Sequence, residues 1–538
     1  AVYSDNSSIS HFFTLLNVIK SSVIPDVRLV DMVFESVPDA DLEIIKNQGA
    51  DIKDNIEITS KVSYQNKKPL MMLSFIPLRT NSSTGKIERL VSFKLDYSYN
   101  KSNVLPLKKK SYTYADHSVL KSGDWYRVDV FRSGIHKITY DDLVALGMDV
   151  SSIDPRNIRL YGNGGKMLPE NNMVYRPDDL KENAIYIYGE SDGVFNQGDY
   201  IIFYAQGPES WAFDAVNDSY KHQINKYNSS TAYFLSASLG PGRRIGNEPS
   251  SSLPVDYTVT TFDDHLFHEK DSLNLIKSGR EFYGEVFDVN TSYSFSFNFP
   301  NIVPSTPVKL RTHLLARSIL VSTSFKLYSN GSYITTLPLS PASSNYINPY
   351  ATENESSLQF SSSGSISLRF DYNKSGNSSA IGWLDYVELN AERYLSFVSG
   401  QMPFRNHESV GKGITEFIVE NSNNNVVVWD VTDYANVRKV DATHTDNNLS
   451  YRLNTDSLRE FVAFDDNGFY SVSCTGKVQN QDLHGLGVYN MIIISYPDLI
   501  DQAERLADFH RNNDGLSVLV VTPQLIYNEF SSGNQDIT

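Results

Sequence analysis

Two apolar stretches near the C-terminal end decide the fold there: Val488 to Ser495 is VYNMIIIS, and Leu516 to Val521 is LSVLVV. A stretch that is apolar at nearly every position is typical of a strand whose two faces are both buried. Between the two stretches, Pro497 suits the first turn of a helix. Apolar residues then recur at three- and four-residue steps, in Leu499, Ala503, Leu506 and Phe509. The order strand, helix, strand predicts a βαβ unit with parallel strands.

This unit occupies residues 479–538, and its own elements cannot cover it. Successive side chains of a strand point to opposite faces of the sheet, so both faces need cover, whereas one helix covers only one. We therefore expect residues 479–538 to be the start of a larger α/β domain, truncated at Thr538.

The residues before this unit have the pattern of strands and turns. Tyr (33) and Phe (28) are abundant, and short β-type runs alternate with turns rich in Ser and Asn. Such runs recur between residues 266 and 395 without any long helical period, which predicts a β-sandwich. The expected fold class is mainly β. Five parts are expected: an N-terminal β-rich propeptide-like region (1–105), a β-rich accessory domain with a short helix (118–265), the sandwich (266–395), a small β domain (396–478) and the α/β start (479–538).

Local signals in the second segment are specific. Trp125 to Phe131 and Ile135 to Thr139 flank Arg132-Ser133-Gly134, which predicts a hairpin. Thr139 followed by Asp141 and Asp142 predicts the capped start of a short helix.

Charge and composition exclude some classes of function. The formal charge of −16 and a pI of about 5.2 argue against a nucleic-acid partner. The single cysteine, Cys474, excludes an intrachain disulfide. The sequence contains no run of about 18 apolar residues, so no membrane span is predicted. The start Ala1-Val2-Tyr3-Ser4 is typical of a mature terminus after removal of a signal peptide, or of a cut made within a longer chain. Lys108-Lys109-Lys110 is interpreted as a solvated turn.

Several motifs resemble those of gingipain-type cysteine peptidases, and in particular the sortases of the type IX secretion system. The closing segment is the most specific: Tyr496-Pro497-Asp498 leads to Ala503 through His510, and Val520-Val521-Thr522-Pro523 leads to Ile526 through Gly533. Further upstream the resemblance rests on Ser122 to Tyr126, Ser133 to Thr139, Leu160 to Gly165, Met167 to Glu170, Gly198 to Ala205, and Ser278 to Arg280 with Tyr283 to Glu285.

The resemblance implies a caspase-like α/β peptidase domain. It implies a cysteine endopeptidase and transpeptidase, associated with the outer membrane at the cell surface. Such an enzyme removes the C-terminal signal domain of exported cargo and attaches the cargo to anionic lipopolysaccharide. The implied partners are these signal domains, the lipopolysaccharide and an outer-membrane barrel protein of the secretion system (PorV-like).

The resemblance places the catalytic His after the third strand of the peptidase sheet and the Cys after the fourth. This chain supplies only the first two strands. We therefore expect no catalytic, cofactor-binding or metal-binding residue here. Cys474 and His484, ten residues apart, would form a dyad only if the His lowered the thiol pKa. Both precede the first α/β strand, so a structural role is the preferred interpretation.

Other clusters also receive structural interpretations. His265, His268 and Glu269 (HLFHE) lack the four-residue step between the histidines of HExxH and are interpreted as a polar loop. Gly162-Asn163-Gly164-Gly165 is followed by Lys166-Met167-Leu168-Pro169 and not by a helix, so a tight turn is preferred to a phosphate loop.

Two further features could indicate a bound ligand. Asp192, Asn196 and Asp199 lie in an acidic loop that could hold Ca²⁺, the only cofactor considered, although their spacing is not that of an EF-hand. Trp383-Leu384-Asp385-Tyr386 resembles a strand of carbohydrate-binding sandwiches, with its aromatic residues expected in the core. The β-rich middle of the chain, rich in Tyr, Asn and Ser, supports an alternative function as a non-enzymatic, β-rich surface adhesin or carbohydrate-binding protein. The closing βαβ unit argues against this alternative, because an adhesin would not need it.

Overall fold

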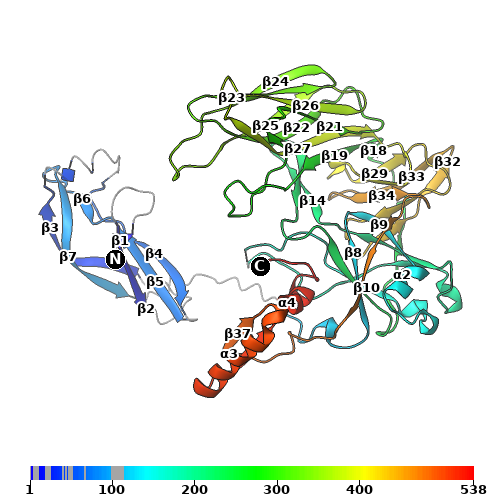
Figure 1. The fold of residues 1–538 in the computed structure, drawn as a ribbon, viewed down its shortest axis with the longest axis horizontal. Helices are drawn as coiled ribbons and strands as arrows, with labels where there is room; N and C mark the ends of the chain where they lie inside the picture. Colours follow the sequence, from blue (N-terminus) through cyan, green and yellow to red (C-terminus); the bar gives the residue numbers. More distant parts are fainter. Residues whose placement is uncertain are drawn as a thin grey trace. The chain divides into compact units, whose positions relative to one another are not determined.

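The structure is a computed structural model that describes residues 2–3, 11–17, 26–38, 41–42, 45, 52–65, 68–98, 114–171 and 173–538. Contacts divide the chain into two units, Ala1–Thr113 and Tyr114–Thr538. Strands predominate in both, drawn in blue for the first unit and from cyan to red for the second (Figure 1). The predicted fold class, mainly β followed by the start of an α/β domain, is confirmed. The predicted turn at Lys108–Lys110 lies outside the described residues.

The residues that the structure describes in the first unit form two small sheets. Their orders are β1-β2-β5-β4 and β3-β7-β6. Met71 and Leu73 form the buried centre, and the rings of Phe12, Phe75 and Phe93 pack together with centroids 4.9–5.4 Å apart. The strands are β1 (Val2–Tyr3), β2 (His11–Asn17), β3 (Asp26–Ser36), β4 (Thr59–Gln65), β5 (Lys68–Phe75), β6 (Leu78–Thr80) and β7 (Ile87–Ser98).

The second unit begins with a pair of sheets that share one core. One has the order β11-β10-β16-β8-β36 and the other β12-β13-β9-β35. Residues 470–478, from the fourth predicted segment, supply one strand to each of these two sheets. The strands are β8 (Trp125–Val130), β9 (Gly134–Thr139), β10 (Arg159–Tyr161), β11 (Glu182–Asn183), β12 (Tyr186–Tyr188), β13 (Tyr200–Ala205), β16 (Thr231–Ser236), β35 (Tyr470–Ser471) and β36 (Ser473–Val478).

The predicted hairpin of Trp125 to Phe131 with Ile135 to Thr139 is wrong. β8 pairs with β16 and β36, whereas β9 pairs with β13 and β35. The intervening turn therefore carries the chain from one sheet to the other. Gly134 permits this crossing: its φ is +144°, and a Cβ would lie 2.6 Å from the ring of Tyr470.

The predicted short helix is confirmed as α2 (Tyr140–Ala145). Thr139 and Asp142 form a capping box in which each side chain accepts the other's backbone N–H. Single-turn 3₁₀ helices occur at η1 (Val119–Lys121), η2 (Val150–Ser152), η3 (Pro155–Asn157), η4 (Glu190–Asp192), η5 (His407–Ser409) and η6 (Pro497–Leu499).

A second pair of sheets forms around another core. Their orders are β17-β31-β30-β34-β28 and β18-β29-β33-β32. The strands are β17 (Gly246–Glu248), β18 (Tyr257–Val259), β28 (Gln401–Arg405), β29 (Ile414–Val419), β30 (Val427–Asp430), β31 (Arg438–Val440), β32 (Thr443–Thr445), β33 (Asn448–Asn454) and β34 (Glu460–Phe464).

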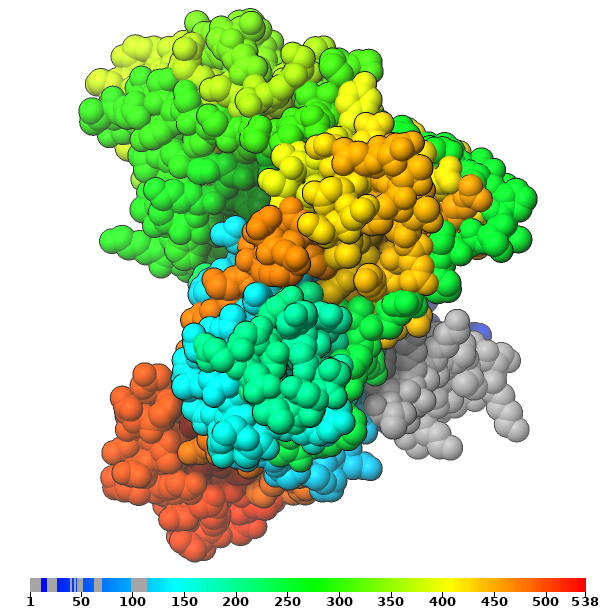
Figure 2. Space-filling view, turned by 90° about the vertical axis from the view of Figure 1, so that its right-hand side faces the viewer, coloured from blue at the N-terminus to red at the C-terminus, as the bar shows by residue number. Residues whose placement is uncertain are grey.

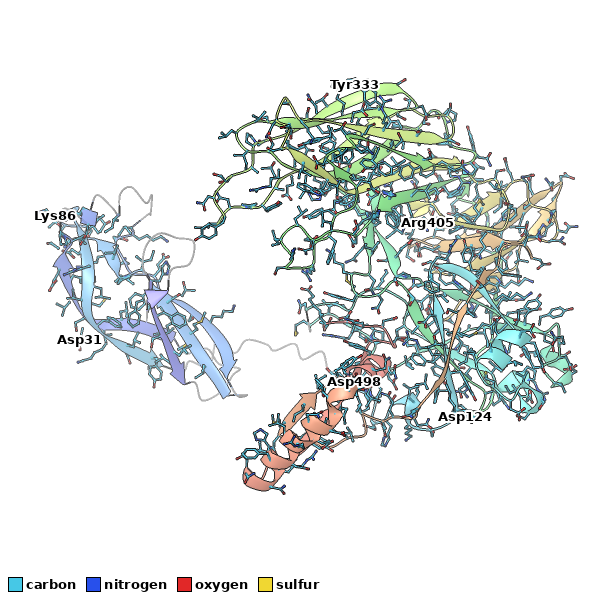
Figure 3. All side chains as sticks on the ribbon, in the orientation of Figure 1. Asp31, Lys86, Asp124, Tyr333, Arg405 and Asp498 are labelled. Carbon is cyan, nitrogen blue, oxygen red and sulfur yellow. The ribbon has the colours of Figure 1, made fainter. Side chains whose placement is uncertain are left out.

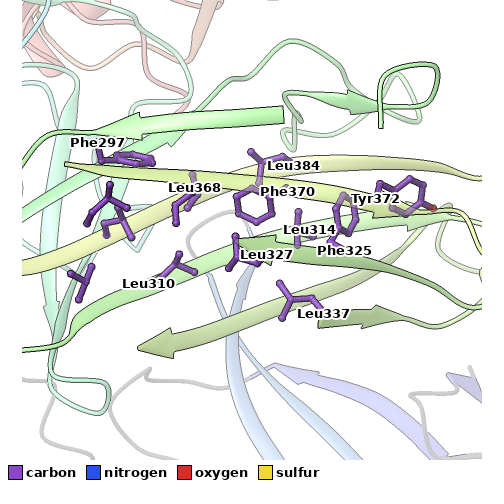
Figure 4. Packing of buried hydrophobic residues seen from close by; sticks show 14 of the residues in the cluster. Phe297, Leu310, Leu314, Phe325, Leu327, Leu337, Leu368, Phe370, Tyr372 and Leu384 are labelled. Carbon is purple, nitrogen blue, oxygen red and sulfur yellow. The ribbon is translucent and has the colours of Figure 1, made fainter. Parts of the chain in front are cut away.

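The predicted sandwich is the third pair of sheets, with the orders β19-β27-β22-β25, where β20 also pairs with β27, and β21-β26-β23-β24. Every second residue of β22 points inward, and large side chains from both sheets interdigitate (Figure 4). Each fully buried aliphatic side chain stabilises the fold by roughly 1.5–3 kcal/mol. The strands are β19 (Thr261–Glu269), β20 (Val286–Phe287), β21 (Ser292–Phe297), β22 (Val308–Arg317), β23 (Thr323–Ser329), β24 (Ser332–Leu339), β25 (Thr352–Phe360), β26 (Ile366–Asn373) and β27 (Ile381–Tyr394).

A hairpin of β14 (Glu209–Asp214) and β15 (Ser219–Ile224) extends from the first pair of sheets to the sandwich. Tyr220 exchanges two hydrogen bonds with the Asn390 amide of β27, at 2.7 and 2.9 Å. The hairpin therefore fastens the sandwich to the first pair of sheets.

The C-terminal segment is the predicted βαβ unit. β37 (Met491–Ile494) and β38 (Val518–Val521) pair in parallel, with α3 (Ile500–Asn513) between them and α4 (Pro523–Phe530) after them. Asp498 marks the turn before α3 (Figure 3). No helix in the described part of the chain is both long and apolar enough to cross a membrane.

Candidate functional site

The candidate functional site is the α/β segment and the surface that receives it. Ala503 and Ala507 of α3 are buried, consistent with the contacts that α3 makes with β38. Ile492 and Ile494 of β37 are 59% and 60% exposed, although the apolar run predicted burial on both faces. The strand is therefore covered on one face only, and the space-filling view shows the unit in red-orange, protruding beside the first pair of sheets (Figure 2).

Glu529 of α4 anchors the segment from within. Its carboxylate is fully buried and accepts hydrogen bonds from the backbone N–H groups of Leu483 (2.7 Å) and His484 (3.1 Å). It also accepts one from the Gln481 side-chain amide at 2.9 Å. Gln481 in turn accepts one from the Asn528 side chain at 2.9 Å. A buried carboxylate is stable only when hydrogen-bonded in this way, so residues 481–484 and α4 form one structural block.

His484 connects this block to the first pair of sheets. Its Nδ1 lies 2.6 Å from the Glu529 carboxylate, and its Nε2 lies 3.5 Å from Asp178. Burial lowers the pKa of His484, but the hydrogen bond to Glu529 and the charges of Asp178 and Asp179 outweigh burial, so the pKa is raised. The ring stacks on Phe530 with centroids 4.6 Å apart. The imidazole therefore links two parts of the fold, and the carboxylates around it favour its protonated form.

The glycine motif at 162–165 forms the second half of this surface. The backbone N–H of Asn163 donates to the Ser532 hydroxyl at 3.0 Å, and Ala232 N–H donates to the Asn534 side chain at 3.0 Å. Leu168 N–H donates to Asp536 at 2.8 Å. A Cβ on Gly165 would collide with the Thr231 hydroxyl and the Gly207 carbonyl. This packing is consistent with a structural turn rather than a phosphate loop. The backbone of the turn helps to hold residues 532–536. We call the Glu529 block and this turn together the seat.

Cys474 and His484 do not form a dyad. The Cys474 thiol, on β36, donates to the Asp142 carbonyl at 3.5 Å. Burial and the nearby Asp142 charge raise the pKa of this thiol, which disfavours the thiolate that a nucleophile needs. Among the hydrogen bonds of the described residues, none joins Cys474 to His484. The structural interpretation of both residues is consistent with this geometry.

His265, His268 and Glu269 lie on β19, so the predicted polar loop is wrong. The register of β19 with β27 places them on an edge strand of the sandwich. His268 pairs with Glu285 at 3.0 Å, and His265 lies 3.1 Å from Arg405. Burial holds the pKa of His265 well below its usual value. The three residues therefore have separate partners and do not converge on a metal.

Glu269 instead belongs to two other groups. Its carboxylate lies 2.5 Å from His222, whose other ring nitrogen lies 2.6 Å from the buried Glu388. An oxygen of Glu269 also lies within 4.8 Å of oxygens of Asp271 and Asp385, a spacing that could hold a metal ion. Burial and the charges of Glu269 and Asp385 raise the pKa of Asp271 to about 6. No sequence pattern predicts this group, because residue 385 is distant along the chain.

The acidic loop considered for Ca²⁺ is closed by its own hydrogen bonds. Asp192 accepts from Val194 N–H at 3.0 Å and from the Asn196 side chain at 3.1 Å. Asp199 accepts from Asn196 N–H at 2.6 Å. These carboxylate oxygens are thus used by the turns of the loop itself.

Trp383 is 3% exposed, so it offers no stacking platform to a sugar. Tyr386, on the same strand, lies under the Arg311 guanidinium at 4.8 Å and donates to Glu355 at 2.9 Å. The expectation that Trp383 is buried is met, whereas Tyr386 takes part in a polar network.

A cavity of about 870 Å³ opens where β19, β28 and the β14 hairpin meet. Arg405, labelled in Figure 3, lines it and pairs with Glu460 at 3.0 Å. Arg393, also in the lining, pairs with Asp264 at 2.7 Å. Both arginines in the cavity wall are therefore already paired with carboxylates of the protein.

Sequence reasoning missed the Glu529 block of the seat. Glu529, Gln481 and Asp178 were not predicted, because a single Glu in a helical segment carries no pattern that indicates burial. The resemblance at Ile526 through Gly533 covers Glu529 but assigns it no role. Only the tertiary contacts between α4 and residues 481–484 identify it.

Comparisons with known proteins match the α/β segment to one family model and most of the chain to one solved structure. The family model Peptidase family C25 matches residues 486–538. A crystal structure of dimeric latent PorU from Porphyromonas gingivalis matches with a TM-score of 0.68 and 26% identity. That match covers 79% of this chain and 39% of the PorU chain, so the chain spans about two fifths of its relative. No curated protein matches the chain in sequence.

Other solved structures are much less similar. A carbohydrate-binding module, CBM36 in complex with calcium and xylotriose, has a TM-score of 0.17 at 14% identity over 23% of this chain and 98% of its own. A β-porphyranase from Bacteroides plebeius has a TM-score of 0.17 at 11% identity over 57% of this chain and 43% of its own. Scores this low carry no argument about fold or function. The C25 match at the α/β segment and the PorU match over most of the chain together support a PorU/gingipain-type protein.

Proposed function

We propose that the chain is the N-terminal part of a type IX secretion sortase. The complete enzyme would be a cysteine endopeptidase and transpeptidase that removes the C-terminal signal domain of exported cargo and attaches the cargo to anionic lipopolysaccharide. The proposal extends the match to PorU and to the C25 peptidases. It includes a cell-surface, outer-membrane location, export by a signal peptide and a PorV-like barrel partner.

One observation supports separate roles for the β domains and the peptidase domain of this enzyme. The segment that matches the C25 peptidases is held in the seat by a buried carboxylate, while the outer face of its sheet is exposed. The proposed role of the β domains is to hold the first strands of the peptidase sheet, and that of the exposed face is to pack against the strands that complete it.

The chemistry would take place beyond the two strands described. A cysteine thiolate would attack the scissile carbonyl, the amine of the signal domain would leave, and a thioester would remain. An amine of the lipopolysaccharide, or water, would then release the thiol. Cys474 is excluded from this role in the proposal, because its thiol pKa is raised and it points to the α2 backbone.

The test compares residues 1–538 with the product of the gene read past Thr538. The substrate is a peptide that spans the junction between a cargo protein and its signal domain. We expect turnover by the longer product alone, and a new amide when an amine acceptor is added. Cys474→Ala should leave that turnover unchanged.

Two outcomes would overturn the proposal. Turnover by residues 1–538 that is lost in Cys474→Ala would make this cysteine the nucleophile. A longer product that shows no cleavage, while residues 1–538 bind glycans on an array, would favour the adhesin or carbohydrate-binding alternative.

A further inference from the structure

Four loops meet at one end of the sandwich. β22 ends at Arg317, which pairs with Ile381 at the start of β27, while neighbouring Ala316 pairs with Thr352 at the start of β25. In the facing sheet, the start of β21 and the start of β23 pair with the end of β26. The connections at this end are residues 288–291, 318–322, 340–351 and 374–380. We call them the loop end.

The loop end concentrates the most exposed apolar side chains of the protein. Among the large apolar residues that the structure describes, six are exposed by three quarters or more. Four of the six lie here: Val289 (98%), Leu320 (89%), Tyr346 (95%) and Ile347 (75%). The other two are Val216 in the β14–β15 turn and Val488 before β37. Single exposed apolar residues are ordinary, but four on adjoining loops form a cluster that water disfavours.

The same loops are nearly free of charge. Asp288 and Lys374 are their only charged residues, and the two form an ion pair at 2.8 Å. Arg317, at the edge of the loop end, stacks on the Tyr350 ring at 4.2 Å. The other loop residues are mainly Ser, Asn, Pro and Gly beside the apolar tips. In a protein with a formal charge of −16, this end is electrically neutral.

Leu320 adds an independent sign of function. Its φ is +67°, a left-handed conformation that costs a bulky residue free energy and is normally left to Gly or Asn. At 89% exposure the side chain gains no packing in return. A strained residue that contributes nothing to the core is typical of a binding loop.

We infer that the loop end docks on a lipid bilayer, with the four apolar side chains inserted among the headgroups. A bilayer fits better than a protein surface because these side chains project from three separate loops, and the loop end carries no net charge and so offers a partner protein no free ionic group to pair with. Uncharged polar loops can enter the headgroup layer without the cost of burying charge. Tyr346 and Tyr350 belong to a residue type that favours the membrane interface. This inference does not depend on peptidase activity.

The experiment is flotation of residues 1–538 with vesicles of phosphatidylethanolamine and phosphatidylglycerol. The test variant combines Val289→Ser, Leu320→Asn and Ile347→Ser, and the matched control combines Val216→Ser with Val488→Ser. All five side chains are exposed, so both variants should keep the unfolding transition of the wild type. We expect the test variant to bind the vesicles about tenfold more weakly or worse, and the control to bind like the wild type. Because the loop end is neutral, added salt should change binding little.

A second measurement places the loops in the bilayer. An environment-sensitive fluorophore on Ile347→Cys, in a Cys474→Ser background, should shift its emission to the blue when vesicles are added. The same label on Val216→Cys should not shift. Failure of the wild-type protein to float would overturn the inference. Flotation of the test variant as strong as that of the wild type would also overturn it. A vesicle-independent increase in molecular mass, lost in the test variant, would also overturn it and would assign the loop end to contact between two copies of the chain.

Discussion

At the scale of single residues, buried charge decides how the α/β segment is held. Glu529 has no exposed side-chain surface and accepts from two backbone N–H groups and two side chains. Removing such a carboxylate costs much stability, because its hydrogen-bond partners are then left unpaired inside the protein, where water cannot replace the lost bonds. The seat is therefore sensitive to substitutions that keep shape but remove charge.

Glu529→Gln should destabilise the seat by about 2–4 kcal/mol. The amide keeps one acceptor oxygen but places a donor against backbone N–H groups and removes the negative charge that faces His484. Hydrogen exchange of α4 measures the free energy of local opening. Glu504→Gln is the matched control, because its carboxylate is 45% exposed and pairs only at the surface. Equal effects of both substitutions would contradict the account.

The pH dependence of the seat follows from His484. Its pKa is raised in the folded protein by Glu529, Asp178 and Asp179, against the effect of burial. The stabilisation is therefore fully present below the unfolded pKa of about 6.5 and is lost as pH rises through the folded pKa. Stability of the seat against denaturant, measured from about pH 6 to pH 9, should fall more steeply for the wild type than for His484→Gln. His510→Gln is the control, because His510 pairs with Asp514 within the α3 region and lies outside the seat. A wild-type slope in His484→Gln would contradict this.

Individual residues were the hardest part of the site to predict. The structural interpretation of Cys474 rested on chain order, and the thiol's contact with Asp142 is consistent with it. Glu529 could not have been predicted, because its burial depends on residues 481–484 folding against α4. The carboxylate group of Glu269, Asp271 and Asp385 likewise forms only when β19 and β27 pair.

At the scale of elements, turns do more than reverse the chain. The motif at 162–165 holds residues 532–536, and the turn before Gly134 joins two sheets. The sequence identified the motif at 162–165 as a tight turn, whereas it predicted a hairpin at Arg132-Ser133-Gly134, which is wrong. The partners of both motifs could not be predicted, because turn chemistry specifies the local backbone and not which distant strand lies beside it.

Gly165→Ala should destabilise the second unit by about 1–3 kcal/mol. The added methyl group would overlap the Thr231 hydroxyl and the Gly207 carbonyl, and backbone atoms cannot move aside cheaply. Gly364→Ala is the control, because no heavy atom lies within 4 Å of the position that its Cβ would take and its φ is not positive. The midpoint of thermal unfolding should fall for the first variant and stay unchanged or rise for the second. A similar midpoint for both would show that residues 162–165 are not closely packed.

Strand periodicity predicted individual elements better than their pairing. The strands of the sandwich, α2 and the βαβ unit lie close to their predicted residues. The histidines of β19 were assigned to a loop because the strand is polar along an edge that faces a cavity and not a core. Edge strands with a polar face lack the alternation on which the prediction depends.

At the scale of the whole molecule, chain order and spatial order differ. Residues 470–478 return to the first pair of sheets after the chain has built two others. The α/β segment therefore starts directly from the sheets on which it is seated. Sequence patterns predicted the α/β start at residues 479–538, and the C25 match covers residues 486–538. The patterns could not show that one face of its sheet would be exposed, or that α4 would be held by the buried Glu529.

Hydrogen exchange tests the central claim most directly, namely that residues 486–538 are the seated opening of a peptidase domain. It would be measured on residues 1–538 and on the product of the gene read past Thr538. The account predicts protection of α4 in both proteins, because the seat is complete in each. It predicts fast exchange of Ile492 to Ile494 in residues 1–538, where two of the three side chains are more than half exposed, and strong protection in the longer product. Equal, strong protection of these three residues in both proteins would contradict it.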